Sequence, residues 1–168
     1  GFQFGSGVLQ FDATGDKKAL EQSKKNTIDK MASHVSHTGV HDHGFNNLST
    51  YGNLLRLMHE GKIADNAWER EFYRLAIKIS GAVQASRWTS IPEGGFIHSF
   101  NGPHSLFVDT IRSCRILVTS HLMGHRYHAE GDIKISLLER ALQHIVSTAK
   151  SSIYYGEGKD PYDVWGRT

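Results

Sequence analysis

The feature of this sequence that most constrains its fold is an alternation between helical stretches with almost no charge and helical stretches rich in charge. Apolar residues recur with the period of an α-helix in six stretches, which cover residues 2–13, 16–35, 44–59, 63–86, 104–123 and 131–151. The first stretch carries a single charged residue, Asp12, and the third carries only Arg56, whereas the second and fourth carry acidic and basic residues along their length. A helix that is apolar all round packs inside a fold, and an amphipathic helix covers it from outside.

This alternation predicts an all-α protein in which three helical hairpins each supply one inner and one outer helix. Gly15, Gly61 and Gly131 fall between the members of successive pairs, where a glycine can end one helix before the next begins. Two concentric layers of such hairpins form an α/α toroid. An ordinary six-helix bundle is the alternative that the same pattern allows. In either case residues 1–168 are expected to form a single domain.

Three hairpins make only an arc of a toroid, so the outermost inner helices lack a neighbour on one side. Such an edge exposes apolar surface. We therefore expect the chain to be the first half of a toroidal catalytic domain, with either further sequence beyond Thr168 or a second copy covering the open edge. The isolated residues 1–168 are then expected to have little or no activity.

The composition excludes several classes of protein. With 39% hydrophobic and 10% aromatic residues, the chain has the make-up of a globular domain. A net charge of +2 is too small to predict nucleic acid as a partner. No apolar run approaches the roughly 20 residues that span a bilayer, so no membrane association is predicted. Cys114 has no second cysteine to pair with, so cysteine usage leaves the cellular compartment open.

Two loops that precede inner helices concentrate aromatic and hydrogen-bonding side chains. The first covers residues 34–44, and the second covers residues 86–103, which show neither a helical nor a strand pattern. Long irregular loops in a compact helical domain commonly carry function. Rings for stacking beside polar groups are typical of a carbohydrate site. The candidate substrate-binding residues are His41, Trp88, His98, Phe100, Asn101 and His104.

Two carboxylates beside these loops are the candidate catalytic residues. Asp42 stands at the start of the third helical stretch, and Asp109 lies near the start of the fifth. A carboxyl group in an apolar cleft can keep its proton at neutral pH and act as a general acid. The structural alternatives are an N-cap for Asp42 and a pair with Arg112 on one helix face for Asp109.

The chain has 11 histidines, and four of them gather at His34, His37, His41 and His43. Four imidazoles this close in sequence approach the spacing of metal ligands. Glycines between and after them break the helical register that a defined ligand face needs, and no cysteine or second carboxylate lies at the spacing of a zinc motif. We therefore predict no metal site, and expect these imidazoles to form hydrogen bonds or to face solvent.

Three short motifs occur in order along the chain: His41-Asp42-His43-Gly44-Phe45, Gly95-Phe96-Ile97-His98-Ser99-Phe100 and Phe107-Val108-Asp109-Thr110. In order and spacing they resemble the approximate motifs His-Asp-x-Gly-Phe, Gly-x-Ile-x-Ser-Trp and Ile-Asp of the unsaturated glucuronyl hydrolases, glycoside hydrolase families 88 and 105. The resemblance covers most of the chain. The fold of these families is an α/α toroid of six hairpins, about twice this length, so the chain is similar to its first half.

The resemblance implies an enzyme that releases a 4,5-unsaturated uronic acid from the non-reducing end of oligosaccharides. In such enzymes an aspartate protonates C4 of the vinyl ether, water adds at C5, and the hemiketal opens with release of the next sugar. Asp109 matches the general acid/base of these families, and Asp42 matches the supporting carboxylate. A uronic-acid-containing oligosaccharide is the implied partner, and no metal or organic cofactor is implied. The compartment stays open between the cytoplasm and the periplasm or exterior of a bacterium.

Phe100 departs from the family pattern, because it stands where these families usually have tryptophan. A phenylalanine can stack on a sugar but cannot donate a hydrogen bond, which indicates altered specificity. One alternative function is the hydrolysis of saturated β-glucuronides on the same fold by two carboxylates. A second alternative is a helical interaction module without chemistry, which predicts no carboxylates facing a common cleft.

Overall fold

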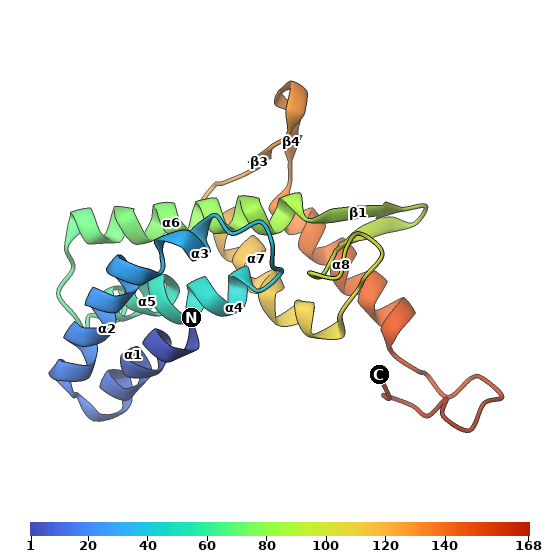
Figure 1. Cartoon of the computed structure of the whole chain (residues 1–168), viewed down its shortest axis with the longest axis horizontal. Helices are drawn as coiled ribbons and strands as arrows, with labels where there is room; N and C mark the ends of the chain where they lie inside the picture. The colour runs from blue at the N-terminus through green and yellow to red at the C-terminus, as the bar shows by residue number, and fades with distance from the viewer.

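The protein, described over residues 1–168 by a computed structural model, is mostly helical and carries two short β-hairpins (Figure 1). The α-helices are α1 (Phe2–Thr14), α2 (Lys17–Lys30), α3 (Ala32–Val35), α4 (His43–Asn47), α5 (Asn53–His59), α6 (Ala67–Ser86), α7 (Arg115–Leu122) and α8 (Leu137–Ser152). The other helical segments are the π-helical η1 (Leu48–Gly52) and the 3₁₀ segments η2 (Val108–Cys114) and η3 (Glu130–Asp132). The strands are β1 (Trp88–Ile91), β2 (Gly94–Ile97), β3 (Tyr127–His128) and β4 (Lys134–Ile135). The predominance of helix confirms the predicted all-α class. The prediction was wrong in that it included no β-hairpins.

α1 and α2 pack on each other as the first predicted hairpin. Gly15 adopts a left-handed conformation with φ 75°, which glycine allows without strain, and this ends α1. The side chain of Asp16 then accepts hydrogen bonds from the backbone N–H groups of Lys18 and Ala19 and starts α2. The second stretch is broken at Met31, after which the short α3 follows, so it is not the single helix that was predicted.

α4, η1 and α5 run on as one helical rod, which confirms the predicted helix 44–59. Residues 43–58 are all buried or partly buried, and Leu54 and Leu57 are fully buried. α6 and α1 both pack against this rod, as does α7 against α4. The rod is therefore the buried inner element that its near absence of charge predicts.

α6 covers the rod as the outer member of the second hairpin. It begins at Ala67, later than the predicted residue 63, because the side chain of Asn66 accepts hydrogen bonds from the backbone N–H groups of Trp68 and Glu69 and caps the helix there. Its buried face also packs on α7, so α6 joins the second and third hairpins.

The third hairpin differs most from the prediction. The predicted helix 104–123 begins only at Val108, and its first part is the 3₁₀ segment η2. The predicted helix 131–151 begins at Leu137, where the hydroxyl of Ser136 accepts a hydrogen bond from a backbone N–H in the first turn of α8. α7 and α8 nevertheless pack on each other as the predicted pair.

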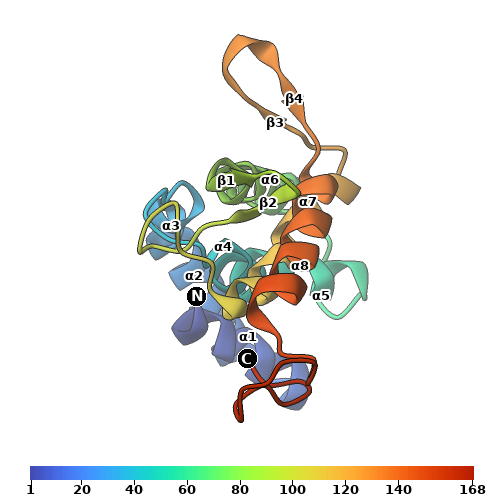
Figure 2. The same ribbon diagram turned by 90° about the vertical axis from the view of Figure 1, so that its right-hand side faces the viewer.

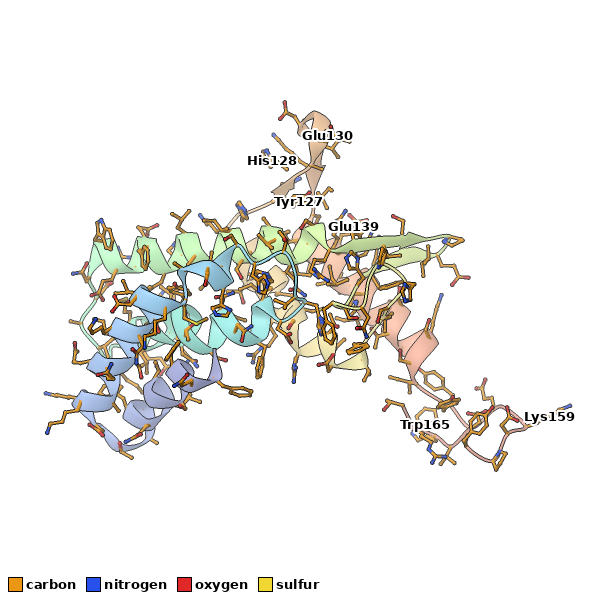
Figure 3. The ribbon with its side chains drawn as sticks, viewed as in Figure 1. Tyr127, His128, Glu130, Glu139, Lys159 and Trp165 are labelled. Atoms are coloured by element: carbon orange, nitrogen blue, oxygen red, sulfur yellow. The ribbon has the colours of Figure 1, made fainter.

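The chain between α7 and α8 forms the β3–β4 hairpin in place of a short helical turn. Gly131 has φ 70° and lies at the tip of this hairpin, so it lies between α7 and α8 as predicted but does not form a short turn that ends one of them. The outer part of the hairpin, with His128 and Glu130, stands away from the body of the molecule (Figures 2 and 3), whereas Tyr127 at its base packs against the core. None of the helices is both long enough and apolar enough to cross a bilayer.

Residues 86–103, predicted to be irregular, contain the antiparallel β1–β2 hairpin. Its strands have four residues each, which is too short for an alternation of apolar and polar residues to be visible. Two buried side chains of α8 hold it in place. His144 Nδ1 accepts a hydrogen bond from the backbone N–H of Ile97 at 3.1 Å, and the Ser147 hydroxyl donates to the carbonyl of Gly95 at 2.8 Å.

Apolar side chains are exposed at both ends of the helical array, where Figure 1 places α1 and α8. On α1, Phe2 is 66% exposed and Leu9 is 51% exposed, so the prediction that this helix is buried on all sides was wrong. At the other end, Leu142 of α8 is 54% exposed and Val146 of the same helix is 50% exposed. The expectation that the open edges of the helical array expose apolar surface is thus confirmed.

Candidate functional site

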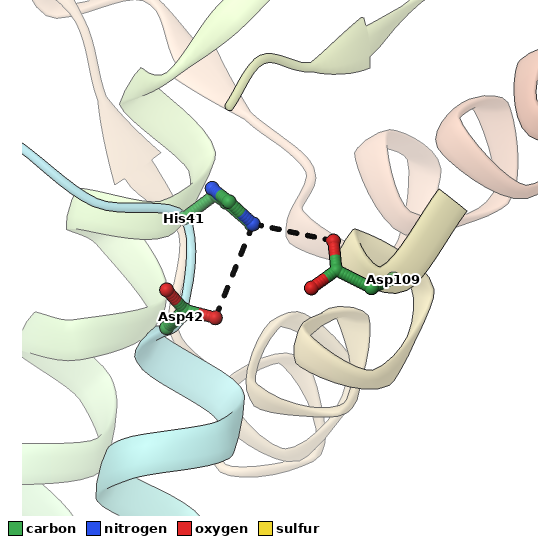
Figure 4. A group of neighbouring side chains, drawn as sticks. All are labelled: His41, Asp42 and Asp109. Carbon is green, nitrogen blue, oxygen red and sulfur yellow. Dashed lines mark ion pairs between the residues drawn. The ribbon is translucent and has the colours of Figure 1, made fainter. Parts of the chain in front are cut away.

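His41, Asp42 and Asp109 meet where two inner helical elements begin (Figure 4). His41 and Asp42 directly precede α4, and Asp109 lies in the first turn of η2. The His41 Nε2 atom lies 3.4 Å from Asp109 Oδ1 and 3.9 Å from Asp42 Oδ1. A His41 ring nitrogen and one oxygen of each carboxylate all lie within 4.8 Å of one another. The two predicted catalytic carboxylates are therefore close in space although they are distant in sequence.

Arg112 brings a positive charge to both carboxylates. Its Nη2 donates a hydrogen bond to Asp109 Oδ2 at 2.9 Å and reaches Asp42 Oδ1 at 3.4 Å. The centre of its guanidinium group lies 4.4 Å from the centre of the Phe45 ring, in a cation–π contact. Arg112 thus connects η2 to α4 and offsets the repulsion between the two negative charges.

These contacts decide between the structural interpretations of the two carboxylates. Asp42 occupies the N-cap position of α4, but its side chain makes no hydrogen bond to the start of this helix, so the prediction that its carboxylate caps α4 was wrong. Asp109 does form the i,i+3 pair with Arg112. Its other oxygen, Oδ1, faces His41 and has no hydrogen-bond partner in the protein. Asp109 therefore belongs to the helix-face pair and to the cluster at the same time.

A close approach of two backbones brings the carboxylates together. Gly44 of α4 packs so tightly on η2 that a Cβ atom at this position would lie 2.2 Å from the carbonyl oxygen of Ser113. Only glycine fits there without moving one of the two elements. Because Asp42 shortly precedes Gly44, and Asp109 lies about one helical turn before Ser113, this contact sets the spacing of the two carboxylates.

His41 is buried, with only 2% of its surface exposed. Phe100 stacks on the imidazole with the ring centres 5.7 Å apart, and Phe107 meets it edge-on at 5.8 Å. Neither ring nitrogen has a hydrogen-bond partner in the protein. The imidazole is therefore held by aromatic packing, and its Nε2 atom faces the two carboxylates.

Two of the predicted substrate-binding residues lie in the β1–β2 hairpin and just after it. Trp88 packs against the core, and the guanidinium group of Arg140 lies 4.7 Å from its ring, so one face of the ring is already covered. His98 Nδ1 lies 3.2 Å from the Thr89 hydroxyl. Burial lowers the pKa of His98, and the charge of Arg87 lowers it further.

The other predicted substrate-binding residues lie on the loop that follows β2. Phe100 is 57% exposed and forms the outer wall over His41. Asn101 and His104 are exposed and make no contact with the carboxylates. The structure thus brings Phe100 and His41 together with Asp42 and Asp109, while the roles of Asn101 and His104 stay predictions.

His43, a member of the histidine group at the start of α4, supports the fold. Its Nδ1 lies 2.7 Å from the Ser80 hydroxyl, and its Nε2 lies 2.8 Å from the carbonyl oxygen of His37, to which it donates. Burial is the main cause that lowers the pKa of His43, so the imidazole is neutral at pH 7. This confirms the expectation of a hydrogen-bonding imidazole at this position.

A divalent cation is a cofactor that the side chains of the cluster could ligate. His41, Asp42 and Asp109 offer one nitrogen and two carboxylate oxygens, which suit such an ion. Only His41 is shared with the histidine group considered from the sequence. Arg112 already places a cation against both carboxylates, so one of their two negative charges is compensated without a metal.

Arg87 ties the two loops of the site together, a role that the sequence did not reveal. It is only 8% exposed, and its guanidinium group donates hydrogen bonds to the backbone carbonyls of Thr38, His98 and Ser99. The first of these carbonyls belongs to the loop before α4, and the other two belong to the loop that leads to Phe100. No local pattern distinguishes such an arginine from one on the surface, because its partners are distant backbone groups.

An open hollow of about 420 Å³ lies beside Asp109. Phe107, Tyr154, Ser151 and Ser152 contribute to its walls. Aromatic rings and hydroxyl groups of this kind suit a small polar ligand such as a sugar. A larger groove of about 670 Å³ runs between α5, α6 and α7, but it contains none of the predicted site residues.

The comparisons with known proteins found no match to this chain. No family model, no curated protein and no solved structure matches the chain. The likeness to the unsaturated glucuronyl hydrolases therefore rests on the three sequence motifs alone.

Proposed function

We propose that this protein is a glycoside hydrolase that releases a terminal 4,5-unsaturated uronic acid from oligosaccharides by acid-catalysed hydration of the vinyl ether. The observation that carries the proposal is the cluster of Asp109, Asp42 and His41 at the start of two inner helices. These residues come from the motifs that resemble the glucuronyl hydrolases, and they lie beside exposed Phe100 and the hollow next to Asp109.

In the proposed reaction Asp109 is the acid, and its two oxygens have different surroundings. Oδ2 accepts the hydrogen bond from Arg112, whereas Oδ1 faces His41 without a hydrogen-bond partner. A proton carried on the Asp109 carboxyl group is transferred to C4 of the sugar, and the positive charge that develops at C5 is stabilised by the Asp42 carboxylate. Water then adds at C5 and returns a proton to Asp109, and the hemiketal opens with release of the next sugar.

The fold that we propose to support this reaction is an α/α toroid, of which these residues supply three hairpins. Three observations favour it: a largely buried rod from α4 to α5, an outer helix α6 that covers it, and exposed apolar residues at both ends of the array. Further hairpins on those edges would enclose the oligosaccharide.

Hydrolysis of a saturated β-glucuronide is the second candidate function. The spacing of the two carboxylates restricts the mechanism by which it could proceed. Oxygens of Asp42 and Asp109 lie within 4.8 Å of each other. An inverting glycosidase needs its carboxyl groups about 6.5–9.5 Å apart to admit water between them. The cluster therefore favours hydration of the vinyl ether, or a retaining mechanism, over inverting hydrolysis.

The test is an absorbance assay on an unsaturated disaccharide produced by a polysaccharide lyase. The C4=C5 double bond is conjugated to the carboxylate and absorbs in the ultraviolet, and hydration removes this band. We expect Asp109→Asn to keep the fold and to lower kcat by about 10²–10⁴-fold, because an amide cannot deliver the proton. Asp132→Asn, on the exposed β3–β4 hairpin, is the matched control and should react at the wild-type rate.

Three results would count against the proposal. Loss of absorbance at the wild-type rate in Asp109→Asn would remove Asp109 from the chemistry. Cleavage of a saturated β-glucuronide without any reaction of the unsaturated substrate would favour the second candidate. Absence of both reactions at saturating substrate and high protein concentration would favour the interaction module without chemistry.

A further inference from the structure

His41 is a buried imidazole whose two nitrogens are both without a hydrogen-bond partner in the protein. Only 2% of its surface is exposed. Buried polar groups nearly always have partners, so an unpaired one calls for an explanation. The Nε2 atom faces the carboxylates of Asp42 and Asp109, at 3.9 and 3.4 Å (Figure 4). This nitrogen therefore points into the cluster, toward the place where a ligand would meet both carboxylates.

The carboxylates also offer oxygens that Arg112 does not use. Its Nη2 donates to Asp109 Oδ2, whereas Asp109 Oδ1 is buried and has no hydrogen-bond partner. On Asp42, the same Nη2 reaches Oδ1 at 3.4 Å. The two oxygens of an ionised carboxylate can accept about four contacts between them, so this long contact leaves Asp42 free to bind a second group.

The charge of the cluster favours a cation as that group. Two carboxylates and one guanidinium group give a net charge of −1 when the imidazole of His41 is uncharged. A site with net negative charge repels an anion and attracts a cation. An imidazolium at His41 is the other way to balance the charge, and it predicts that no metal ion binds.

The spacing of the donor atoms suits a tetrahedral ion. Zn²⁺ binds imidazole nitrogens and carboxylate oxygens at about 2.0–2.2 Å, which places neighbouring ligand atoms about 3.4 Å apart. The distance from His41 Nε2 to Asp109 Oδ1 is 3.4 Å, and that to Asp42 Oδ1 is 3.9 Å. Asp42 would move by about 0.5 Å to reach the tetrahedral spacing. An imidazole among the ligands favours a transition metal over Ca²⁺ and Mg²⁺, which take oxygen ligands.

We propose that His41, Asp42 and Asp109 form a binding site for a divalent transition-metal ion such as Zn²⁺. The ligands are His41 Nε2 and one oxygen of each carboxylate, and the fourth tetrahedral position is left to solvent. Phe100 and Phe107 already hold the imidazole in place, so little side-chain entropy is lost when the ion binds. The sequence did not indicate this site, because the second carboxylate comes from η2, far from the histidine group.

The site goes beyond the proposed function, which needs no metal, and it affects the same acid. A ligating carboxylate is deprotonated. The ion would therefore take the place of the proton on Asp109, and Zn²⁺ is expected to inhibit the proposed hydration reaction.

The experiment measures metal binding directly. Zinc chloride is titrated into the full chain by calorimetry, and X-ray absorption of the loaded protein identifies the ligands. We expect one strong site with a single imidazole and with oxygen ligands at about 2.0–2.2 Å. His41→Gln should remove this site. Asp42→Asn and Asp109→Asn should each weaken binding at least about tenfold, because even residues that only support a ligand contribute about 10–100-fold.

His37→Gln is the matched control for the imidazole, since it removes an exposed histidine of the same group, and Asp132→Asn is the control for the carboxylates. Both should keep the strong site. Circular dichroism establishes that each variant is folded. The two aspartate variants test the site even if His41→Gln does not fold, because the side chains of Asp42 and Asp109 are partly exposed.

Three results would overturn the proposal. The first is the absence of a strong site in wild type, which would favour an imidazolium at His41. The second is a bound ion with two or more imidazole ligands, which would show an adventitious ion only, held by surface histidines. The third is binding as tight as wild type in Asp42→Asn and Asp109→Asn.

The outcome is separable from that of the proposed function. Zinc binding that depends on His41 and Asp109, without any inhibition of the loss of ultraviolet absorbance, would support the metal site and reject Asp109 as the acid. Hydration that depends on Asp109, in a chain that binds no zinc, would support the reaction and reject the metal site.

Discussion

Three charged side chains set the electrostatics of the site. Asp42 and Asp109 would repel each other, and Arg112 holds both with contacts of 3.4 and 2.9 Å. Asp42 is the less exposed carboxylate, with 25% of its side chain exposed against 40% for Asp109. In the proposed reaction this makes Asp42 the fixed stabilising charge and Asp109 the group that meets the substrate.

Asp42→Asn is expected to affect both binding and rate. The amide keeps the shape of the side chain but removes the charge that stabilises the transition state, as well as one ionic partner of Arg112. We expect kcat/KM to fall about 10²-fold, with a rise in KM, when the loss of ultraviolet absorbance is followed at several substrate concentrations. Unchanged kcat and KM would show that Asp42 has no part in the reaction.

Arg87→Met is expected to loosen both loops of the site. The apolar side chain fills similar space but leaves the carbonyls of Thr38 and His98 without a donor, and leaves that of Ser99 with the backbone N–H of Gly102 alone. We expect the free energy of unfolding to fall by about 2–3 kcal/mol in urea titrations, with activity reduced at temperatures where the variant is folded. Arg126→Met, at an exposed position, is the control and should leave stability unchanged. Equal stability of the two variants would contradict the role of Arg87.

At the scale of elements, the sequence predicted the features that depend on many residues. The absence of charge over residues 44–59 predicted the buried rod, and the order of apolar and amphipathic stretches predicted which helices pair. It could not predict β1 and β2, because strands of four residues show no period. Nor could it predict that residues 104–107 stay outside the helix, or that residues 127–135 form a hairpin.

For the site too, the sequence predicted some features and could not predict others. Asp42 and Asp109 could be predicted because each stands at the start of an inner element, and elements that run in parallel bring such positions together. The burial of His41 between Phe100 and Phe107 could not, because it depends on how a loop folds back over α4. The hydrogen bonds of Arg87 to the loop carbonyls could not be predicted for the same reason.

Gly44→Ala tests the contact between α4 and η2. The added methyl group would lie 2.2 Å from the Ser113 carbonyl oxygen and 2.6 Å from its Cα, both backbone atoms that cannot turn aside. We expect a loss of about 1–3 kcal/mol in the free energy of unfolding, and a fall in activity because Asp42 and Asp109 move apart.

Gly52→Ala is the matched control for this substitution. A Cβ atom there meets the flexible side chain of Leu48, with 2.8 Å to its Cδ2 atom, and this side chain can rotate away. We expect a smaller loss of stability and normal activity. Equal effects of the two substitutions would show that the backbone contact of Gly44 does not set the geometry of the site.

At the scale of the whole molecule, the site remains open to water. The side chains of Asp42, Asp109 and Arg112 are 25%, 40% and 48% exposed. Charges stabilise a transition state most strongly where water is excluded. We therefore expect residues 1–168 alone to turn over the unsaturated disaccharide slowly, in a reaction that still depends on Asp109. Turnover in the usual range of about 1–10³ s⁻¹ would contradict this expectation.

Two buried histidines couple the stability of the whole molecule to pH. Burial lowers the pKa of His43, and it lowers that of His144 to about 4. In the unfolded chain a histidine takes up a proton below about pH 6.5. Between about pH 6.5 and 4 the unfolded state therefore binds more protons than the folded state, so the free energy of unfolding falls as the pH falls. The full effect of His144 over this window is about 3 kcal/mol.

His144→Asn separates this titration from the structural role of the side chain. An asparagine keeps an acceptor near the position of Nδ1 for the backbone N–H of Ile97, but it does not titrate. Urea unfolding at pH 7 and pH 4.5 should show that wild type loses about 2–3 kcal/mol more than the variant, because only wild type must keep a buried imidazole neutral in acid. His128→Asn, on the exposed β3–β4 hairpin, should lose as much stability as wild type. If His144→Asn and wild type lost stability equally, the buried imidazole would not be a source of the acid sensitivity.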